Sequence, residues 1–160
     1  MRLLAHRETE EGTAAGVYGV IVGAAVMAAA HAESVAALDV AVLATLLIYW
    51  CAERYARLVA QRIHAGHRPG WPAVRRELTT GWEIVTASLL PLLVLSIAGR
   101  LGADLDTAVL LGLLCSTALL ALAGWEMGYG EALSPAERVV SALVAATFGA
   151  AMILLKSLLH

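Results

Sequence analysis

Long apolar runs separated by short polar links dominate the chain. A membrane-spanning helix needs about 20 mostly apolar residues to cross roughly 30 Å of hydrocarbon at about 1.5 Å per residue. Five runs approach that length, at about residues 13–32, 35–58, 82–98, 107–123 and 138–159. The pattern therefore predicts an all-α fold, a polytopic transmembrane helix bundle of five spans that forms one transmembrane domain over residues 1–160.

The composition also favours a membrane protein. Of 160 residues, 60% are hydrophobic and the mean hydropathy is +0.77, which is not typical of a soluble domain. The segment Met1–Gly12 carries three acids where a secretory signal would be basic, and no clear cleavage site follows, so the first span is expected to stay in the mature protein. Cys51 and Cys115 lie in apolar runs and are expected to pack as small hydrophobic residues.

Glycines mark the first span. Gly12, Gly16, Gly19 and Gly23 are spaced by three and four residues, which lets a second helix approach closely. We interpret the stripe as a close helix crossing, either by plain packing or as the wall of a lumen, and in both cases the helix should lie inside the bundle. In the third span, Pro91 removes one backbone hydrogen bond, which predicts a kink or a loosened turn.

A short interfacial helix is predicted between the second and third spans, over about residues 72–80. Pro72 suits its first position, and two arginines lie near its middle. On the inner membrane surface, four side chains would contact lipid headgroups: Arg75, Arg76, Trp71 and Trp82. A solvated loop is the alternative.

The basic residues predict the orientation. With five spans, one side of the membrane and the adjoining helix ends hold Arg2, Arg7, Arg54, Arg57, Arg62, Arg68, Arg75, Arg76 and Arg138, whereas the other holds only Arg100 and Lys156. By the positive-inside rule the N-terminus is cytoplasmic and the C-terminus lies outside. Every Trp and Tyr also maps to the cytoplasmic half or its interface.

A polar stripe marks the end of the second span. Glu53, Arg57 and Gln61 recur at four-residue intervals, with Tyr49 one turn earlier. A carboxylate at mid-membrane costs on the order of 2.5–3.5 kcal/mol and less near the interface, so Glu53 should find a partner or keep its proton. Arg57 is the expected partner, because residues four apart share a helix face. Two neighbouring arginines are expected to snorkel to the headgroups: Arg54 and Arg62.

Two other carboxylates, Glu83 and Glu126, are expected at a similar depth on neighbouring helices. Their convergence has two interpretations. One is a cytoplasmic-side vestibule for a cation, a proton or a small solute, and the other is a ring of salt bridges that fixes the helix ends. In the first, five residues belong to the ion or substrate pathway: Tyr49, Glu53, Arg57, Glu83 and Tyr18.

The other polar residues predict little chemistry. His31 with Glu33, and His64 with His67, offer two ligands each where a metal site needs three or four, so no metal and no cofactor is predicted. No motif for hydrolysis, phosphate, dinucleotide or nucleic-acid binding occurs. We therefore predict no catalytic residue, no enzyme activity and no nucleic-acid partner.

Helix ends account for the remaining charges. Asp104 and Asp106 suit capping of the fourth span, and Lys156 near the end of the fifth is expected to snorkel. The string Ser134-Pro135-Ala-Glu137 predicts the start of the fifth span, with the serine as N-cap and the proline in the first helical position.

Motifs in the first three spans carry a resemblance. They are Tyr18-Gly19, Tyr49-Trp50-x-x-Glu53-x-Tyr55-Ala56 and Trp82-Glu83-Ile84-Val85-x-Ala87-Ser88-x-x-Pro91. Over nearly the whole chain, the sequence resembles a group of small integral membrane proteins of actinobacterial type, which implies a multi-pass protein of the bacterial inner membrane but no activity. The glycine-rich first helix is also similar to that of vacuolar iron transporter-type proteins. The chain departs from that type, because Ala14 and Ala15 stand where an acid is needed and the loop after the second helix is basic. Iron or manganese transport is therefore only an analogy.

Two functions remain as hypotheses. The first is a small channel or transporter for an ion or a small solute, working as a homo-oligomer through faces rich in small residues. The second is a non-transporting scaffold or accessory subunit, whose basic cytoplasmic face binds membrane lipid or a protein partner.

Overall fold

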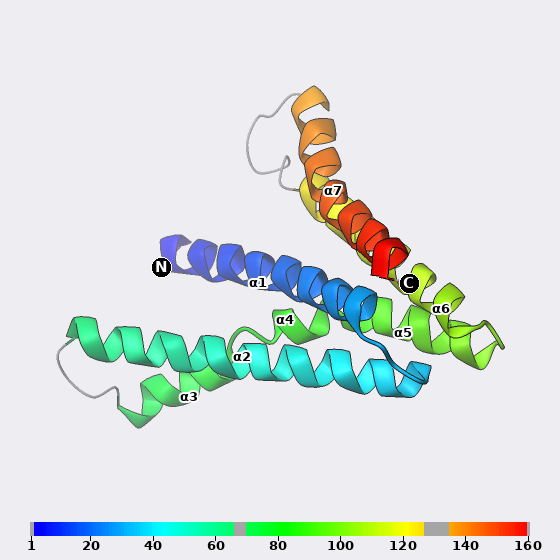
Figure 1. Cartoon of the computed structure of the whole chain (residues 1–160). Coiled ribbons are helices and arrows are strands. Elements are labelled where there is room, and N and C mark those ends of the chain that lie inside the picture. Colours follow the sequence, from blue (N-terminus) through cyan, green and yellow to red (C-terminus); the bar gives the residue numbers. More distant parts are fainter. Residues whose placement is uncertain (1, 66–69, 127–134, 160) are drawn as a thin grey trace.

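The computed structural model describes residues 2–65, 70–126 and 135–159, and this part of the chain contains helices and no strands (Figure 1). Its helices are α1 (Arg2–Ala29), α2 (Val35–Ala65), α3 (Trp71–Thr79), α4 (Glu83–Thr86), α5 (Leu89–Arg100), α6 (Leu105–Glu126) and α7 (Pro135–Leu159). Within the described residues, five segments are long and apolar enough to cross a membrane, and α4 with α5 forms the third. The predicted all-α fold with five candidate spans is confirmed.

The helices differ from the predicted spans mainly at their ends. α1 begins at Arg2, although only its part from Gly12 to Ala29 is apolar enough to span a membrane. α2 continues to Ala65, beyond the predicted apolar run. The short helix predicted at residues 72–80 is α3, and the alternative of a loop is wrong. α7 begins at Pro135 as predicted, whereas its proposed N-cap, Ser134, lies outside the described residues.

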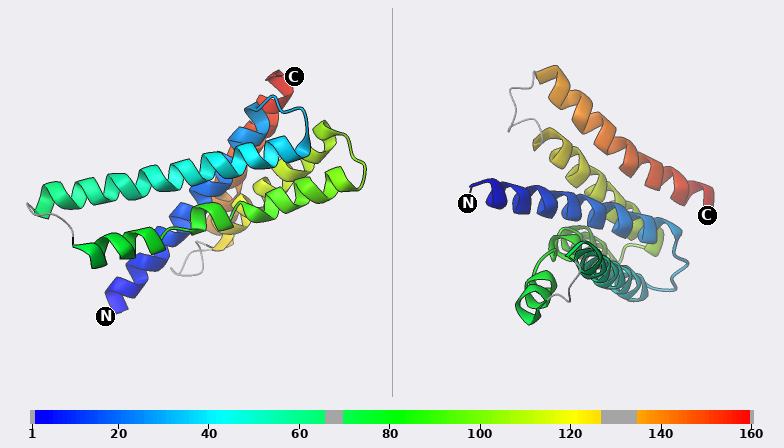
Figure 2. Two further views of the ribbon diagram at one scale, coloured as in Figure 1. Left: turned by 90° about the horizontal axis from the view of Figure 1, so that it is seen from below. Right: turned by 90° about the vertical axis from the view of Figure 1, so that its left-hand side faces the viewer.

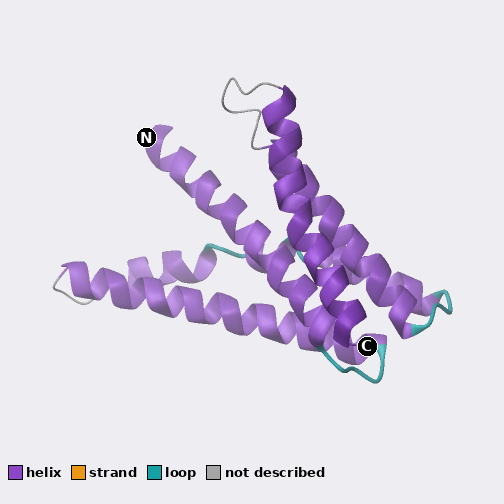
Figure 3. Cartoon of the chain, turned by 45° about the horizontal axis from the view of Figure 1, so that its top comes forward, coloured by secondary structure: helices purple, strands orange, loops and turns teal. Residues whose placement is uncertain are grey.

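α1 lies at the centre of the bundle. It contacts α2, α4, α6 and α7. Figure 2 shows α1 between the layer of α2, α4 and α5 and the pair of α6 and α7. The start of α1 and the end of α7 lie at opposite ends of the molecule, as an odd number of spans requires (Figure 3). The helices converge near the α1–α2 link and diverge toward the opposite end.

The glycine stripe of α1 packs against the third span. A Cβ built on Gly19 would lie 2.0 Å from the backbone oxygen of Ile84, and one on Gly16 would lie 3.5 Å from the Cβ of Ala87. Only a residue without a side chain can approach another backbone so closely. The predicted close crossing is therefore confirmed, with α4 as the partner helix.

The third span is broken, as Pro91 predicts. α4 ends at Thr86 and α5 begins at Leu89. Pro91 has no N–H to donate to Ala87, and its ring clashes with that carbonyl, so regular helical bonding stops before it. The hydroxyl of Ser88 is buried at the break and has no hydrogen-bond partner among the described residues.

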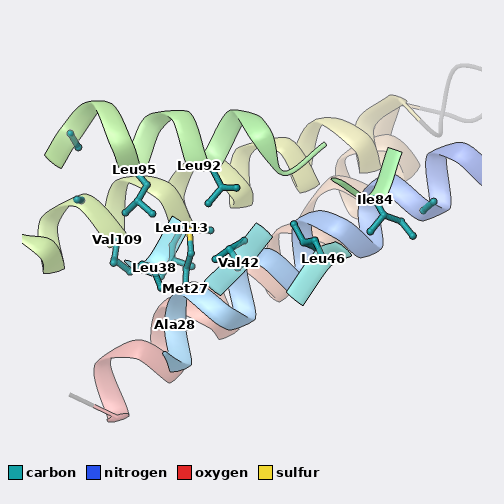
Figure 4. Packing of buried hydrophobic residues seen from close by; sticks show 14 residues of the cluster. Met27, Ala28, Leu38, Val42, Leu46, Ile84, Leu92, Leu95, Val109 and Leu113 are labelled. Carbon is teal, nitrogen blue, oxygen red and sulfur yellow. The ribbon is translucent and has the colours of Figure 1, made fainter. Parts of the chain in front are cut away.

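The buried core joins four spans (Figure 4). Met27 of α1, Leu38 of α2, Leu95 of α5 and Leu113 of α6 are almost completely buried in it. By contrast, α7 contributes only partly buried residues to this cluster. In lipid, such packing stabilises mainly through van der Waals contact, because the surrounding chains are as apolar as leucine. α7 is therefore the peripheral span.

Candidate site at the end of the second span

The predicted ion pair of the polar stripe is present. Arg57 donates from Nε and Nη2 to the same Glu53 oxygen, Oε1, over 3.1 and 2.8 Å. The Nη2 atom of Arg54 also lies 3.1 Å from that oxygen. One carboxylate therefore neutralises part of the charge of two guanidinium groups, and the cluster keeps a net positive charge.

Arg54 corrects one prediction. It was expected to snorkel to the headgroups, but its side chain is only 3% exposed. Its Nη1 donates to Thr80 Oγ1 over 3.0 Å, and the guanidinium packs on Gly81. The physical reason is register, because Arg54 lies one helical turn after Trp50 and shares its inward face.

Gly81 makes room for this arginine. Its φ angle is +75°, a backbone conformation that side chains disfavour. A Cβ at this position would lie 2.4 Å from Nη2 of Arg54. Both the turn and the close approach therefore require glycine.

Two tryptophans complete the same contact. The rings of Trp50 and Trp82 stack with centroids 4.6 Å apart and an interplanar angle of 29°. Trp50 Nε1 also donates to the backbone oxygen of Thr80 over 3.1 Å. We call Trp50, Arg54, Thr80, Gly81 and Trp82 the clamp, because together they fix the α3–α4 link against α2.

The clamp determines where α3 lies. On α3, Trp71 is 74% exposed and Arg75 is exposed as well, whereas the side chain of Arg76 lies outside the described part. Trp82, the fourth predicted headgroup residue, has one face on Trp50 and remains 44% exposed. Contact of these residues with lipid stays a prediction.

The remaining pathway residues form no described hydrogen bond or ion pair with Glu53. Tyr18 on α1 is exposed, and so is Tyr49, which lies one turn before Glu53 on α2. Glu83 lies at the start of α4, where a Cβ on Gly12 would be 3.4 Å from its Oε1. The side chain of Glu126 lies outside the described part. The structure thus joins Glu53 with Arg57, and a common pathway through all five residues stays a prediction.

Comparison with known proteins adds nothing to this site. No family model, curated protein or solved structure matches the chain. The two resemblances drawn from the sequence motifs stay predictions. The function has to be argued from the geometry of the side chains.

Sequence reasoning missed a second polar contact, at the other end of α2. The hydroxyl of Ser96 on α5 donates a hydrogen bond to Asp39 Oδ2. The other oxygen, Oδ1, is buried without a hydrogen-bond partner among the described residues. The signal was available, because an acid inside an apolar span is a candidate functional residue by default.

Charged residues near the start of α6 form a separate group. Asp104 caps the helix, accepting from the backbone N–H of Thr107 over 3.1 Å and from its hydroxyl over 2.7 Å. These hydrogen bonds, the hydroxyl first, lower the pKa of Asp104. Asp106 forms an ion pair of 3.0 Å with Lys156, so that lysine is bonded within the bundle and is 8% exposed overall. Capping by Asp104 is confirmed, whereas the snorkelling predicted for Lys156 is replaced by this ion pair.

Metal chemistry finds no support in the part of the chain that the structure describes. No group of three or more His, Cys, Asp or Glu side chains occurs there. His67, one of the sequence candidates, lies outside the described residues. Both cysteines are free thiols, and Cys51 is exposed rather than buried.

Proposed function

We propose that the protein is a non-transporting, non-enzymatic module of the bacterial inner membrane, which binds anionic lipid headgroups through α3. Its N-terminus lies in the cytoplasm and its C-terminus outside. The observation that carries the proposal is the clamp, because it holds a short helix with an exposed tryptophan and an exposed arginine at a fixed place beside α2.

The electrostatics of Glu53 favour this function over cation binding. Its Oε1 already lies within 3.1 Å of two guanidinium groups, so little negative charge remains for a passing cation. By contrast, the arginines of α3 have an obvious ligand at an anionic membrane surface. Each basic side chain there contributes about 1 kcal/mol. Arg75 and Arg76 together would then supply about 2 kcal/mol, which corresponds to an affinity ratio of about 30.

Lipid titration tests the proposal. Purified protein in detergent is titrated with phosphatidylglycerol and, separately, with phosphatidylcholine, and bound lipid is counted by native mass spectrometry. The double variant R75Q/R76Q should lower the preference for phosphatidylglycerol by up to about 30-fold. R100Q is the control, because Arg100 is an exposed arginine at the end of α5, on the side opposite to α3 in the proposed orientation. An unchanged preference in R75Q/R76Q, or an equal loss in R100Q, would contradict the proposal.

Transport of an ion or a small solute by a homo-oligomer is the second candidate. The observation that favours it is Asp39, an acidic residue inside a candidate span, with one buried oxygen that has no hydrogen-bond partner among the described residues. Flux assays in proteoliposomes test it. If transport occurs through this region, D39N should abolish flux of the transported ion while the protein still assembles. No flux of any cation, anion or proton by the unaltered protein would exclude it.

A further inference from the structure

The break in the third span lies inside the bundle. α4 ends at Thr86 and α5 begins at Leu89, both within the candidate span Glu83–Arg100. Ile84 before the break and Leu92 after it belong to the buried core (Figure 4). The polar groups that the break leaves behind are therefore enclosed by protein at a depth where the bilayer supplies no water.

Two backbone carbonyl groups lose their helical partner at this break. The N–H of Ser88 donates to the oxygen of Val85 over 3.2 Å, three residues earlier, so it does not bond to the oxygen of Ile84 as it would in a regular α-helix. The oxygen of Ala87 loses its partner as well, because Pro91 has no N–H. Two acceptors are thus released within one turn.

The hydroxyl of Ser88 adds a group that can both donate and accept. Ser88 occupies the N-cap position of α5, but its side chain makes no capping hydrogen bond. The residue is only 2% exposed, and its Oγ has no hydrogen-bond partner among the described residues. A buried hydroxyl without a partner costs free energy, so this position favours a ligand that can bond to it.

The glycine stripe of α1 leaves space beside this hydroxyl. At Gly19 the two backbones touch, because a Cβ there would lie 2.0 Å from the oxygen of Ile84. At Gly23, one turn later, the nearest atom to a built Cβ is Oγ of Ser88 at 3.3 Å, and the next is Cγ1 of Val42 at 3.5 Å. The gap between the helices therefore widens along the stripe, and a space of about the size of a methyl group remains at Gly23.

The chemistry of these groups selects a small, neutral ligand. One hydroxyl and two carbonyl oxygens carry no net charge, so an ion would exchange its hydration shell for too few partners. A water molecule both donates and accepts, and buried waters usually bond to polar groups that lack other partners. Ordered water is also one of the means by which membrane helices satisfy backbone groups that a proline has released.

We propose that the break in the third span is a binding site for one ordered water molecule, which accepts from the hydroxyl of Ser88 and donates to the backbone oxygen of Ile84. Both groups face the glycine stripe of α1, one turn apart, so one molecule can join them. The water replaces the missing helical bond between these residues and allows the broken span to persist in the bilayer. The site is separate from α3, and its failure would leave the function proposed for α3 intact.

Radiolytic footprinting tests the proposal. A short X-ray pulse converts bound water into hydroxyl radicals, which oxidise the side chains beside it, and mass spectrometry locates the oxidised residues. Val42 lies beside the space, and Leu46 lies one turn further along α2; both are 0% exposed. We expect oxidation of Val42 but not of Leu46. S88A should abolish the oxidation of Val42. S116A is the matched control and should leave it unchanged, because the buried hydroxyl of Ser116 already donates to the oxygen of Gly112 over 3.1 Å.

Two further measurements keep the result decisive. G23A fills the space with a methyl group and should also abolish the oxidation of Val42. If the variants do not fold, a high-resolution crystal structure of the unaltered protein should show a solvent peak at about 2.5–3.0 Å from Oγ of Ser88 and from the oxygen of Ile84. Equal protection of Val42 and Leu46 in the unaltered protein would overturn the proposal. So would oxidation of Val42 that persists in S88A, or a hydroxyl of Ser88 that bonds directly to the oxygen of Ile84.

Discussion

Two carboxylates, one toward each end of the candidate span in α2, are bound in opposite ways. Near one end, Glu53 accepts charge-assisted bonds from Arg57 and lies 3.1 Å from Arg54. Near the other, Asp39 receives a single hydroxyl from Ser96 and keeps a buried oxygen without a described partner. The first carboxylate is part of a charged cluster on α2, which reaches the α3–α4 link through Arg54, and the second is a polar contact between two spans.

This difference has an energetic meaning. Removing one member of a buried ion pair leaves the other charge buried without compensation, so the substitution destabilises the protein strongly. An interhelical hydrogen bond within a membrane contributes less, about 0.6 kcal/mol on average, because the unfolded helices also find partners in lipid. The cluster of Glu53, Arg54 and Arg57 should therefore contribute more to the free energy of unfolding than the contact of Asp39. Substitution of Asp39 should be tolerated better.

One of the two largest effects is expected for E53Q. The substitution removes the negative charge that lies 3.1 Å from Nη2 of Arg54, whose side chain is only 3% exposed. A broken buried pair costs about 3–5 kcal/mol, and we expect about 2 kcal/mol because Glu53 keeps 26% of its side chain exposed. Equilibrium unfolding in mixed micelles measures the loss. R57Q serves as the control and should cost less, since the Arg57 side chain is 35% exposed. If E53Q costs no more than D39N, the contrast between the two ends is wrong.

A second prediction uses two glycines with positive φ. Gly81 (φ +75°) faces Arg54, whereas Gly102 (φ +90°) has no atom within 4 Å of a Cβ built on it. Backbone strain of about 1–3 kcal/mol applies to both G81A and G102A. The free energy of unfolding should fall further in G81A than in G102A, because the added methyl group also displaces the guanidinium of Arg54. Thermal unfolding of the two variants separates the steric contribution from the strain, and equal losses would show that the clamp tolerates movement of Arg54.

The sequence predicted the large features of this fold because they follow from local rules. Apolar runs of the right length predicted the five spans, the glycine spacing predicted the crossing at Gly19, and Pro91 predicted the break between α4 and α5. Each of these depends on residues close together in the chain. The same holds for the ion pair of Glu53 with Arg57, because i and i+4 positions share a helix face.

Contacts between distant segments could not be predicted in the same way. Arg54 and Thr80 are 26 residues apart, and Asp39 and Ser96 are 57 apart. Their pairing depends on how α2 rotates against the third span, and hydrophobic periodicity does not fix that rotation when a helix is apolar on nearly all sides. For this reason the sequence predicts Arg54 at the headgroups, and it does not predict the contact of Asp39 with Ser96.

A smaller effect is expected at the contact between Asp39 and Ser96. D39A and S96A should each destabilise by about 0.6 kcal/mol and by no more than roughly 1.7 kcal/mol. The double variant should lose less stability than the two single variants lose together, because both substitutions remove the same hydrogen bond. Unfolding of the single and double variants in micelles measures this coupling. Fully additive losses would mean that the contact contributes nothing to the packing of α2 on α5.

The smallest effect is expected at Asp104, outside the spans. Hydrogen bonds from Thr107 lower the pKa of this carboxyl in the folded protein. Its contribution to stability is therefore present above the unfolded pKa of about 3.9, and it is lost as the pH falls through the lower folded value. D104N should remove that part of the acid dependence, since an asparagine can cap the helix but does not titrate. Thermal unfolding of both proteins from neutral pH to about pH 2 checks the prediction: the curves should approach each other at the acidic end. A constant difference between them would show that the cap of α6 does not depend on the charge of Asp104.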